Sequence, residues 1–232
     1  MDFLQNKFFL IALTFGFYLA AQFLQRRTGI KLLNPILIAI AAMISFLMLC
    51  GIDYDTYKQG GDYIDFWLKP AVVALGVPLY KQLSTIKRQL LPLLLSELAG
   101  CVAGVVSVVL LAEMFGATRD VVISLAPKAV TTPIAMEISS AMGGIAPLTA
   151  AVVVATGIFG GMTGFRIVKM SRIHSPIAEG LSIGTAAHAV GTSAAMERSE
   201  RYGAFSSIGL TLNGLFTALL APMILELLGY SV

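Results

Sequence analysis

Charged side chains are scarce in this chain of 232 residues. Asp, Glu, Lys and Arg together make up 12% of it, whereas hydrophobic residues make up 57%. A soluble domain carries about 25% charged residues, so too few charges remain here to cover the surface of a soluble protein of this size. The composition therefore excludes a soluble enzyme. It predicts an all-helical protein that crosses the lipid bilayer several times.

Cysteine is rarer still, and the excess of positive charge is small. The two cysteines, Cys50 and Cys101, both lie within apolar runs and predict neither a disulfide framework nor a metal site. The formal net charge of +3 is too small to indicate binding to nucleic acid. We find no Gly-rich phosphate loop and no nucleophile motif in the sequence, and we expect no cofactor, no metal and no catalysis.

The apolar runs define the expected architecture. A membrane-spanning helix needs about 20 residues, which leaves room for about eight membrane segments. We predict a single transmembrane domain over 1–232, with N-terminal helices in 1–120, a first repeat unit in 121–179 and a second in 180–232. The expected segments are Phe8–Leu24, Pro35–Cys50, Tyr63–Tyr80, Leu90–Leu111, Val121–Gly144, Ile145–Gly164, Gly180–Glu197 and Phe205–Gly229.

Two polar stretches resemble each other and define the repeat. KAVTTPIAME (Lys128–Glu137), aligned without gaps on HAVGTSAAME (His188–Glu197), gives six identical residues out of ten at a constant offset of 60. Pro127, just before the first stretch, and Pro133 within it interrupt a helix there, as Gly184 and Gly191 do around the second. The alternative is a chance likeness between two Ala-rich stretches. A duplicated unit with interrupted helices at matching positions is typical of a transporter's binding site.

The distribution of Lys and Arg among the loops bears on the path of the two interrupted segments. If both segments cross the membrane, the basic residues divide almost evenly between the two sides. If both are re-entrant, the cytoplasmic loops hold most of them, in line with the positive-inside rule. We therefore favour re-entrant segments that enter from opposite sides, with an outside (periplasmic) N-terminus. Two full crossings would bring the same residues to mid-membrane.

The interrupted segments carry the candidate binding residues. Backbone N–H groups freed at membrane depth suit an anion. Lys128 adds a positive charge that costs about 2.5–3.5 kcal/mol to bury on insertion scales, unless its side chain snorkels to a nearby interface. We predict a small cavity for a small organic anion. Its predicted substrate-binding residues are Lys128, Thr131, Thr132, Pro133, Thr185, His188, Thr192 and Ser193.

His188 and Glu97 are the candidate proton-coupling residues. His188 stands opposite Lys128 in the repeat, and an unperturbed histidine titrates near pH 6.5. Its alternative role is that of a neutral packing residue bonded to a backbone carbonyl. Glu97 is a lone carboxyl group in an apolar run, and its alternatives are a partner for Lys128 or a protonated acid that faces the bundle. Asn213 is typical of a helix–helix contact.

The stretches SLAPKAVTTPIAME and IGTAAHAVGTSAAME resemble the signature segments of the LrgB/CidB family of bacterial membrane proteins. LKPAVVALGVPLY, LTAAVVVATGIFG and SSIGLTLNGLFTALLAP extend the resemblance over nearly the whole chain. The family includes the C-terminal half of the plastidial glycolate/glycerate translocator of plants. The resemblance implies a C2–C3 acid as the substrate and a smaller LrgA/CidA-like membrane protein as a partner.

Two functions follow as hypotheses, because bacterial members of that family have been described in both ways. The first is a secondary transporter of small monocarboxylates of the glycolate, glycerate, pyruvate and lactate class, coupled to H+ or Na+ and with a homo-oligomer as a candidate assembly. The second is a holin/antiholin-like regulator of murein hydrolase export and cell lysis. Both place a multi-pass protein in the cell inner (plasma) membrane. We favour transport, since a pore that only assembles has little need of duplicated polar segments.

Overall fold

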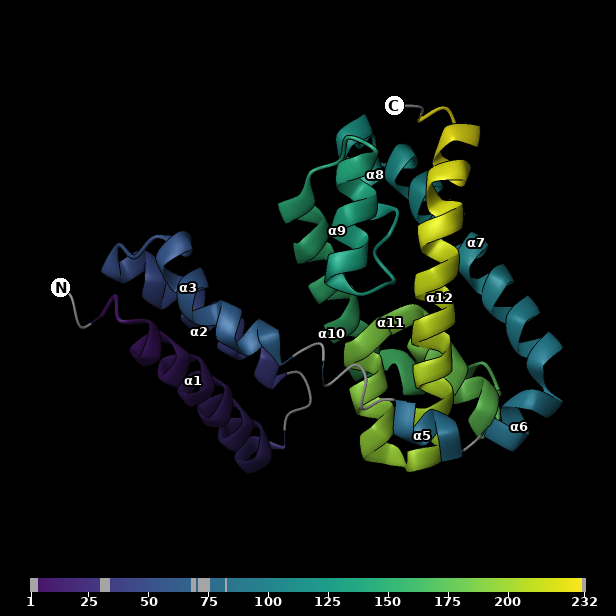
Figure 1. Cartoon of the computed structure of the whole chain (residues 1–232), viewed down its shortest axis with the longest axis horizontal. Helices are drawn as coiled ribbons and strands as arrows, with labels where there is room; N and C mark the ends of the chain where they lie inside the picture. Colours follow the sequence, from purple (N-terminus) through teal and green to yellow (C-terminus); the bar gives the residue numbers. More distant parts are fainter. Residues whose placement is uncertain (1–3, 30–33, 68–69, 71–75, 82, 231–232) are drawn as a thin grey trace. The chain divides into compact units, whose positions relative to one another are not determined.

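A computed structural model of the chain describes residues 4–29, 34–67, 70, 76–81 and 83–230. Within those ranges every regular element is a helix, which confirms the all-helical prediction. The chain divides into two compact units, Met1–Leu75 and Gly76–Val232 (Figure 1).

The smaller unit consists of three helices, with α2 and α3 both packed on α1: α1 (Lys7–Thr28), α2 (Pro35–Cys50) and α3 (Tyr54–Phe66). Asn6 and Asn34 cap α1 and α2. The side-chain oxygen of each accepts hydrogen bonds from two backbone N–H groups of the first turn, which satisfies donors that have no partner within the helix. Lys7 Nζ donates a hydrogen bond of 3.1 Å to the Tyr63 hydroxyl of α3.

The larger unit is built around its C-terminal helix, α12. Its helices are α5 (Gly76–Lys81), α6 (Leu83–Arg88), α7 (Leu90–Met114), α8 (Arg119–Leu125), α9 (Thr132–Ala141), α10 (Ala146–Met170), α11 (Pro176–Arg198) and α12 (Glu200–Leu227). Helices α11, α7, α5 and α9 pack against α12, and α10 packs against α11 and α9. Figure 1 shows α12 in yellow, upright among its neighbours.

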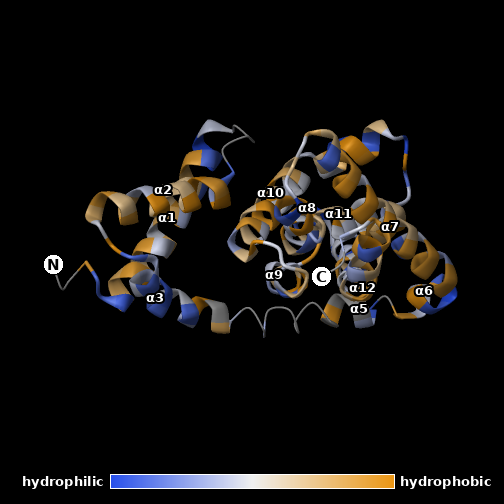
Figure 2. Ribbon diagram, turned by 90° about the horizontal axis from the view of Figure 1, so that it is seen from above, coloured by the Kyte–Doolittle hydropathy of each residue, from blue (hydrophilic) through white to orange (hydrophobic). Residues whose placement is uncertain are grey.

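Four helices of the described residues are long and apolar enough to span a membrane: α1, α7, α10 and α12. Figure 2 shows the hydrophobic residues in orange along these helices. Helix α2 is apolar but shorter, with 16 residues. The predicted third segment, Tyr63–Tyr80, falls partly outside the described residues, and its described parts belong mainly to α3 and α5. The membrane character of the chain thus rests on these four spans, and the larger number of segments stays a prediction.

The first interruption expected from the sequence separates α8 from α9. Helix α8 ends at Leu125, and α9 begins only at Thr132. The chain reverses between them, because the end of α9 returns to the side of α8. The Ser124 hydroxyl of α8 accepts a hydrogen bond of 2.7 Å from the backbone N–H of Ile145, just beyond α9. Helices α8 and α9 therefore form a helical hairpin whose tip is the turn 126–131.

The second interruption lies inside α11, at Ala187 and His188. Both residues have non-helical backbone angles, and His188 has a positive φ of 41°. The chain reverses here too. A Cβ on Gly184, before the break, would collide with the Ser206 carbonyl of α12, and the Thr192 hydroxyl, after the break, lies 3.0 Å from Ser206 Oγ. Both arms of α11 thus contact the same turn of α12.

Glycines permit close contacts between α10 and the arms of α11. A Cβ on Gly157 would lie 2.5 Å from Cε1 of the His188 ring, and one on Gly160 or Gly164 would collide with a side chain of α11. Small residues spaced three or four apart allow such close approach in membrane helices, where packing contributes most of the association.

Candidate functional site

Asn213 of α12 joins the two helical hairpins. Its side-chain Nδ2 donates hydrogen bonds to the carbonyl oxygens of Ala129 (3.1 Å) and Thr185 (3.0 Å). Ala129 lies in the tip of the α8–α9 hairpin, and Thr185 lies just before the break in α11. Both carbonyls lie at interruptions of helices, so the amide fixes the two interruptions next to each other. The sequence signal for this role was a single amide within a long apolar run.

A cavity of about 310 Å³ lies where the two interruptions meet α7 and α12. Its wall is formed by α7, the tip of the α8–α9 hairpin, the first arm of α11 and the middle of α12. Small and apolar residues make up much of this wall. Its main polar side chains are Ser96, Glu97, Lys128, Ser182, Thr185 and Asn213.

Glu97 is the most deeply buried charged residue of this cavity, with 1% of its surface exposed. Its Oε1 lies 2.5 Å from the hydroxyl oxygen of Thr185. Its Oε2 is buried and has no hydrogen-bond partner among the described residues. Since buried polar atoms are nearly always paired, this oxygen is an exception among the buried side chains of the described residues.

Lys128 supplies the positive charge of the cavity. It lies in the tip of the α8–α9 hairpin, where its backbone N–H donates to the carbonyl of Leu125 (3.1 Å), and it is partly buried. Lys128 and Glu97 line the same cavity but form no ion pair, since the one ion pair among the described residues joins Lys81 to Glu200. The cavity therefore offers an ammonium group to an anion and, separately, a buried carboxyl group.

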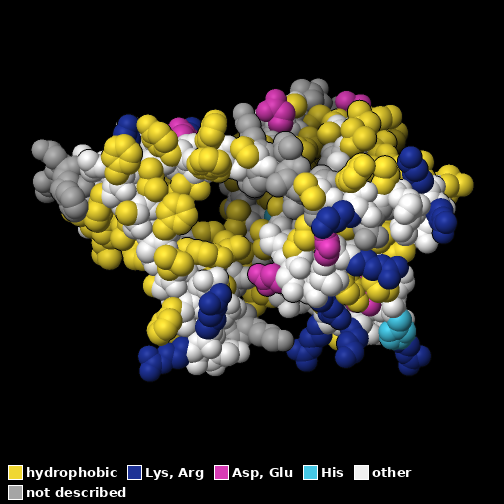
Figure 3. Space-filling view, turned by 60° about the horizontal axis from the view of Figure 1, so that its bottom comes forward, with side chains coloured by type: hydrophobic (Ala, Val, Ile, Leu, Met, Phe, Trp, Pro, Cys, Tyr) yellow, Lys and Arg dark blue, Asp and Glu magenta, His cyan; other side chains and the backbone are white. Residues whose placement is uncertain are grey.

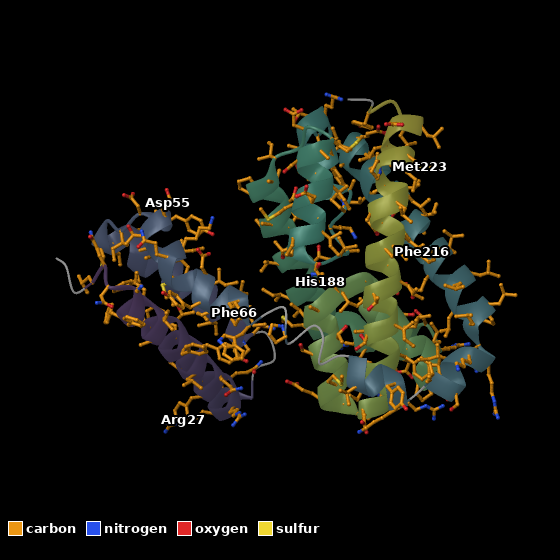
Figure 4. The ribbon with its side chains drawn as sticks, in the orientation of Figure 1. Arg27, Asp55, Phe66, His188, Phe216 and Met223 are labelled. Atoms are coloured by element: carbon orange, nitrogen blue, oxygen red, sulfur yellow. The ribbon has the colours of Figure 1, made fainter. Side chains whose placement is uncertain are left out.

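His188 lies beside the cavity rather than in its wall. Its ring is buried, with 4% of the residue exposed, and Nε2 lies 2.9 Å from the carbonyl oxygen of Val153 in α10. Figure 4 labels His188 within the larger unit. Thr192 donates to the His188 carbonyl (2.9 Å), and the exposed Ser193 donates to Ala189 (3.1 Å). The hydroxyl groups of Thr192 and Ser193 thus form hydrogen bonds within the second arm of α11.

The remaining predicted residues lie at the start of α9. Thr131 is the N-cap residue, without a side-chain capping bond, and Thr132 and Pro133 form the first turn. None of the three lines the cavity. The structure thus brings Lys128, Thr185 and Glu97 together, and it adds residues that the sequence analysis did not assign to the site, above all Asn213.

Four apolar spans, and a mostly apolar cavity with a few polar side chains at the meeting point of interrupted helices, define a polytopic membrane protein. The chain matches the model of the LrgB-like family over residues 14–227, and it belongs to that family. The match confirms the resemblance seen in the two polar stretches.

Relatives are similar over nearly their whole length. The holin-like protein CidB of Staphylococcus epidermidis is 36% identical over 218 residues, which cover 94% of this chain and 95% of that protein. The holin-like protein CidB of Staphylococcus aureus and the uncharacterized protein YxaC of Bacillus subtilis are similar to the same extent. No solved structure matches the chain.

Proposed function

We propose that this protein is a secondary transporter of small monocarboxylates and that the cavity between the two helical hairpins is its substrate site. The observation that carries the proposal is Lys128, which forms no ion pair with a described residue, in a mostly apolar cavity of about 310 Å³. Pockets for drug-sized ligands measure about 300–1,000 Å³, so this cavity suits a small solute. One ammonium group matches the single charge of glycolate, glycerate, pyruvate or lactate. The chain has no enzymatic role in this proposal.

The position of the hairpins along α12 supports re-entrant segments that enter from opposite membrane faces. The α8–α9 hairpin packs on the C-terminal half of α12, in a cluster with Ala221 and Leu225. Helix α11 contacts the N-terminal half, at Ser206 and Gly209. Asn213 lies between them, where both interruptions meet. Duplicated hairpins whose tips meet at mid-membrane suit alternating access by movement of one part against the other.

The basic residues support the orientation. Exposed Lys and Arg side chains (dark blue in Figure 3) gather at the end of the larger unit where α10 ends and α12 begins. They include Arg166, Lys169, Arg172, Arg198 and Arg201. By the positive-inside rule this end is cytoplasmic, in the inner membrane. In the smaller unit the same rule, applied to Arg26 and Arg27 in the last turn of α1, favours an N-terminus outside.

Further parts of the proposal concern coupling and partners. Glu97 and His188 are the candidate groups for a coupling proton, and Na+ is the alternative ion. The family resemblance adds a smaller LrgA/CidA-like membrane protein as a partner, and a homo-oligomer is a candidate assembly of the chain itself.

Uptake by proteoliposomes tests the transport proposal. Purified protein should take up labelled lactate or pyruvate with saturation. Lys128→Ala should reduce this uptake at least about tenfold, since a charged hydrogen bond contributes about 1.5–3 kcal/mol. Lys169→Ala is the matched control, because this exposed lysine lies outside the cavity. Absence of saturable uptake, with and without the small partner, would refute the proposal.

The names of two relatives favour a second candidate, a holin-like regulator of murein hydrolase export and lysis. A pore of this kind would release from liposomes a dye much larger than lactate, and Lys128→Ala would leave the release unchanged. A transporter retains the dye.

A further inference from the structure

Two short helices, α5 and α6, lie at one end of the membrane spans α7 and α12 (Figure 1). Helix α6 packs on α7 and ends at Arg88, just before α7 begins at Leu90. Helix α5 packs on α12, and the Lys81 ammonium forms an ion pair with Glu200 in the first turn of α12. Because α7 and α12 are long and apolar enough to span a membrane, α5 and α6 together form a surface segment at the level where the bilayer ends.

The surface segment exposes apolar and basic side chains side by side. Val77, Tyr80 and Leu83 are 59%, 77% and 39% exposed. Lys87 and Arg88 are also exposed, and neither forms an ion pair with a described residue. A topology signal needs basic residues but gives no reason for exposed apolar side chains next to them. This combination is typical of a segment that lies in the membrane interface, with its apolar side chains among the lipids.

The other side of the segment is fixed to the protein. Ile86 of α6 packs against a buried cluster that includes Leu93, Leu181 and Phe205. Together with the ion pair between α5 and α12, this packing holds the segment on the ends of the spans. The exposed side chains of the segment are therefore presented to the lipid surface by a supported structure.

The charge at this end fits an anionic lipid. The exposed Arg201, next to Glu200 in the first turn of α12, adds a third basic group to Lys87 and Arg88. The far ends of the same two spans carry carboxyl groups instead, from Glu113 in α7 and Glu226 in α12. A basic residue at a membrane surface strengthens the binding of anionic lipid about fivefold. Charge complementarity thus selects an anionic headgroup over a zwitterionic one.

We propose that the surface segment binds the phosphate headgroup of an anionic phospholipid, in the leaflet that meets this end of α7 and α12. Lys87 and Arg88 contact the phosphate, and Val77, Tyr80 and Leu83 lie against the upper part of the acyl chains. This binding does not depend on the proposed transport function. It is connected to the cavity through one cluster, because Leu181, which packs in the same cluster as Ile86, also lines the cavity.

Native mass spectrometry of the purified full chain in detergent tests the proposal. Phosphatidylglycerol and phosphatidylcholine with the same acyl chains are added in equal amounts. Phosphatidylglycerol should bind saturably and at least about tenfold more tightly. Equal binding of the two lipids overturns the proposal. Glycerol 3-phosphate at the same concentration should not displace the lipid, since it lacks acyl chains. Displacement would identify a site for a free phosphate and would refute a lipid site.

A matched pair of variants locates the site. Lys87→Gln/Arg88→Gln removes two exposed charges from the surface segment and should weaken the binding of phosphatidylglycerol at least about tenfold. Arg166→Gln/Lys169→Gln removes two exposed charges from α10, outside the segment, and should change it less than about twofold. Lys87→Arg/Arg88→Lys keeps both charges and should keep the preference. Equal losses in the two Gln pairs would show that the general charge of this end, and not the surface segment, attracts the lipid.

Discussion

The imidazole Nε2 of His188 lies 2.9 Å from the carbonyl oxygen of Val153, and this contact attaches the break in α11 to α10. His188 also has a φ of 41°, a region that L-residues other than glycine rarely adopt. Such a backbone costs about 1–3 kcal/mol and persists only where the surrounding structure holds it. The reversal of α11 is therefore held by its packing on α10 rather than by local preference.

Replacement of His188 by Gly or by Val separates backbone strain from the lost hydrogen bond. Both variants lose the imidazole, but only Gly accepts a positive φ without strain. We expect His188→Val to be less stable than His188→Gly by about 1–3 kcal/mol, measured by thermal unfolding in detergent. Ala189 is the control, because this neighbouring residue is not among those with a positive φ. There the stability of the Gly variant should exceed that of the Val variant by less than at His188. Equal stability of the two His188 variants would contradict the strain.

Gly157 of α10 lies against the ring of His188. The methyl group of Gly157→Ala would lie 2.5 Å from the His188 ring, so α10 and α11 must separate. Overpacking of this kind costs about 1–3 kcal/mol, which should lower the unfolding temperature. Gly16→Ala is the control, because nothing lies within 4 Å of the added methyl group and alanine favours a helix. A Gly157→Ala protein as stable as Gly16→Ala would show that the two helices are not in close contact.

Much of this architecture could be predicted from the residues. The low charge and the apolar runs predicted membrane helices, and Pro127, Pro133 and the repeat predicted where the chain is interrupted. The direction of side chains at the tips could not be predicted. Lys128 and His188 align in the repeat, but Lys128 lies in a turn of six residues, whereas the reversal at His188 uses two. Different backbone angles turn the aligned side chains towards different neighbours.

The role of Asn213 illustrates a second limit. A single amide in an apolar run predicts a polar contact between helices, and Asn213 makes such contacts. Its partners, however, are backbone carbonyls separated from it by 84 and 28 residues. The carbonyls of Ala129 and Thr185 are available to Asn213 because the helices are interrupted near them. The sequence of α12 contains no information on where those interruptions lie.

Asn213→Leu should therefore affect both hairpins at once. Leucine keeps the size of the side chain but leaves the carbonyls of Ala129 and Thr185 without their donor. A buried group that loses its partner costs about 1–3 kcal/mol, so thermal stability and substrate uptake should both fall. Ser193→Ala removes an exposed hydroxyl and should change stability by no more than about 0.5 kcal/mol. Normal uptake by Asn213→Leu would contradict a joining role for Asn213.

The reactivity of Cys101 can show whether a ligand fills the cavity, and Cys50 is the control. Cys101 lines it and is 2% exposed, whereas Cys50 is exposed. In Cys50→Ser protein, Cys101 is the one remaining thiol. A small methanethiosulfonate should label it slowly and a bulky maleimide should not, and saturating lactate should slow the labelling further by filling the cavity. In Cys101→Ser protein, labelling of Cys50 should be fast and indifferent to lactate. Mass spectrometry of the intact protein measures both rates, and lactate-independent labelling of Cys101 would place the acid outside this cavity.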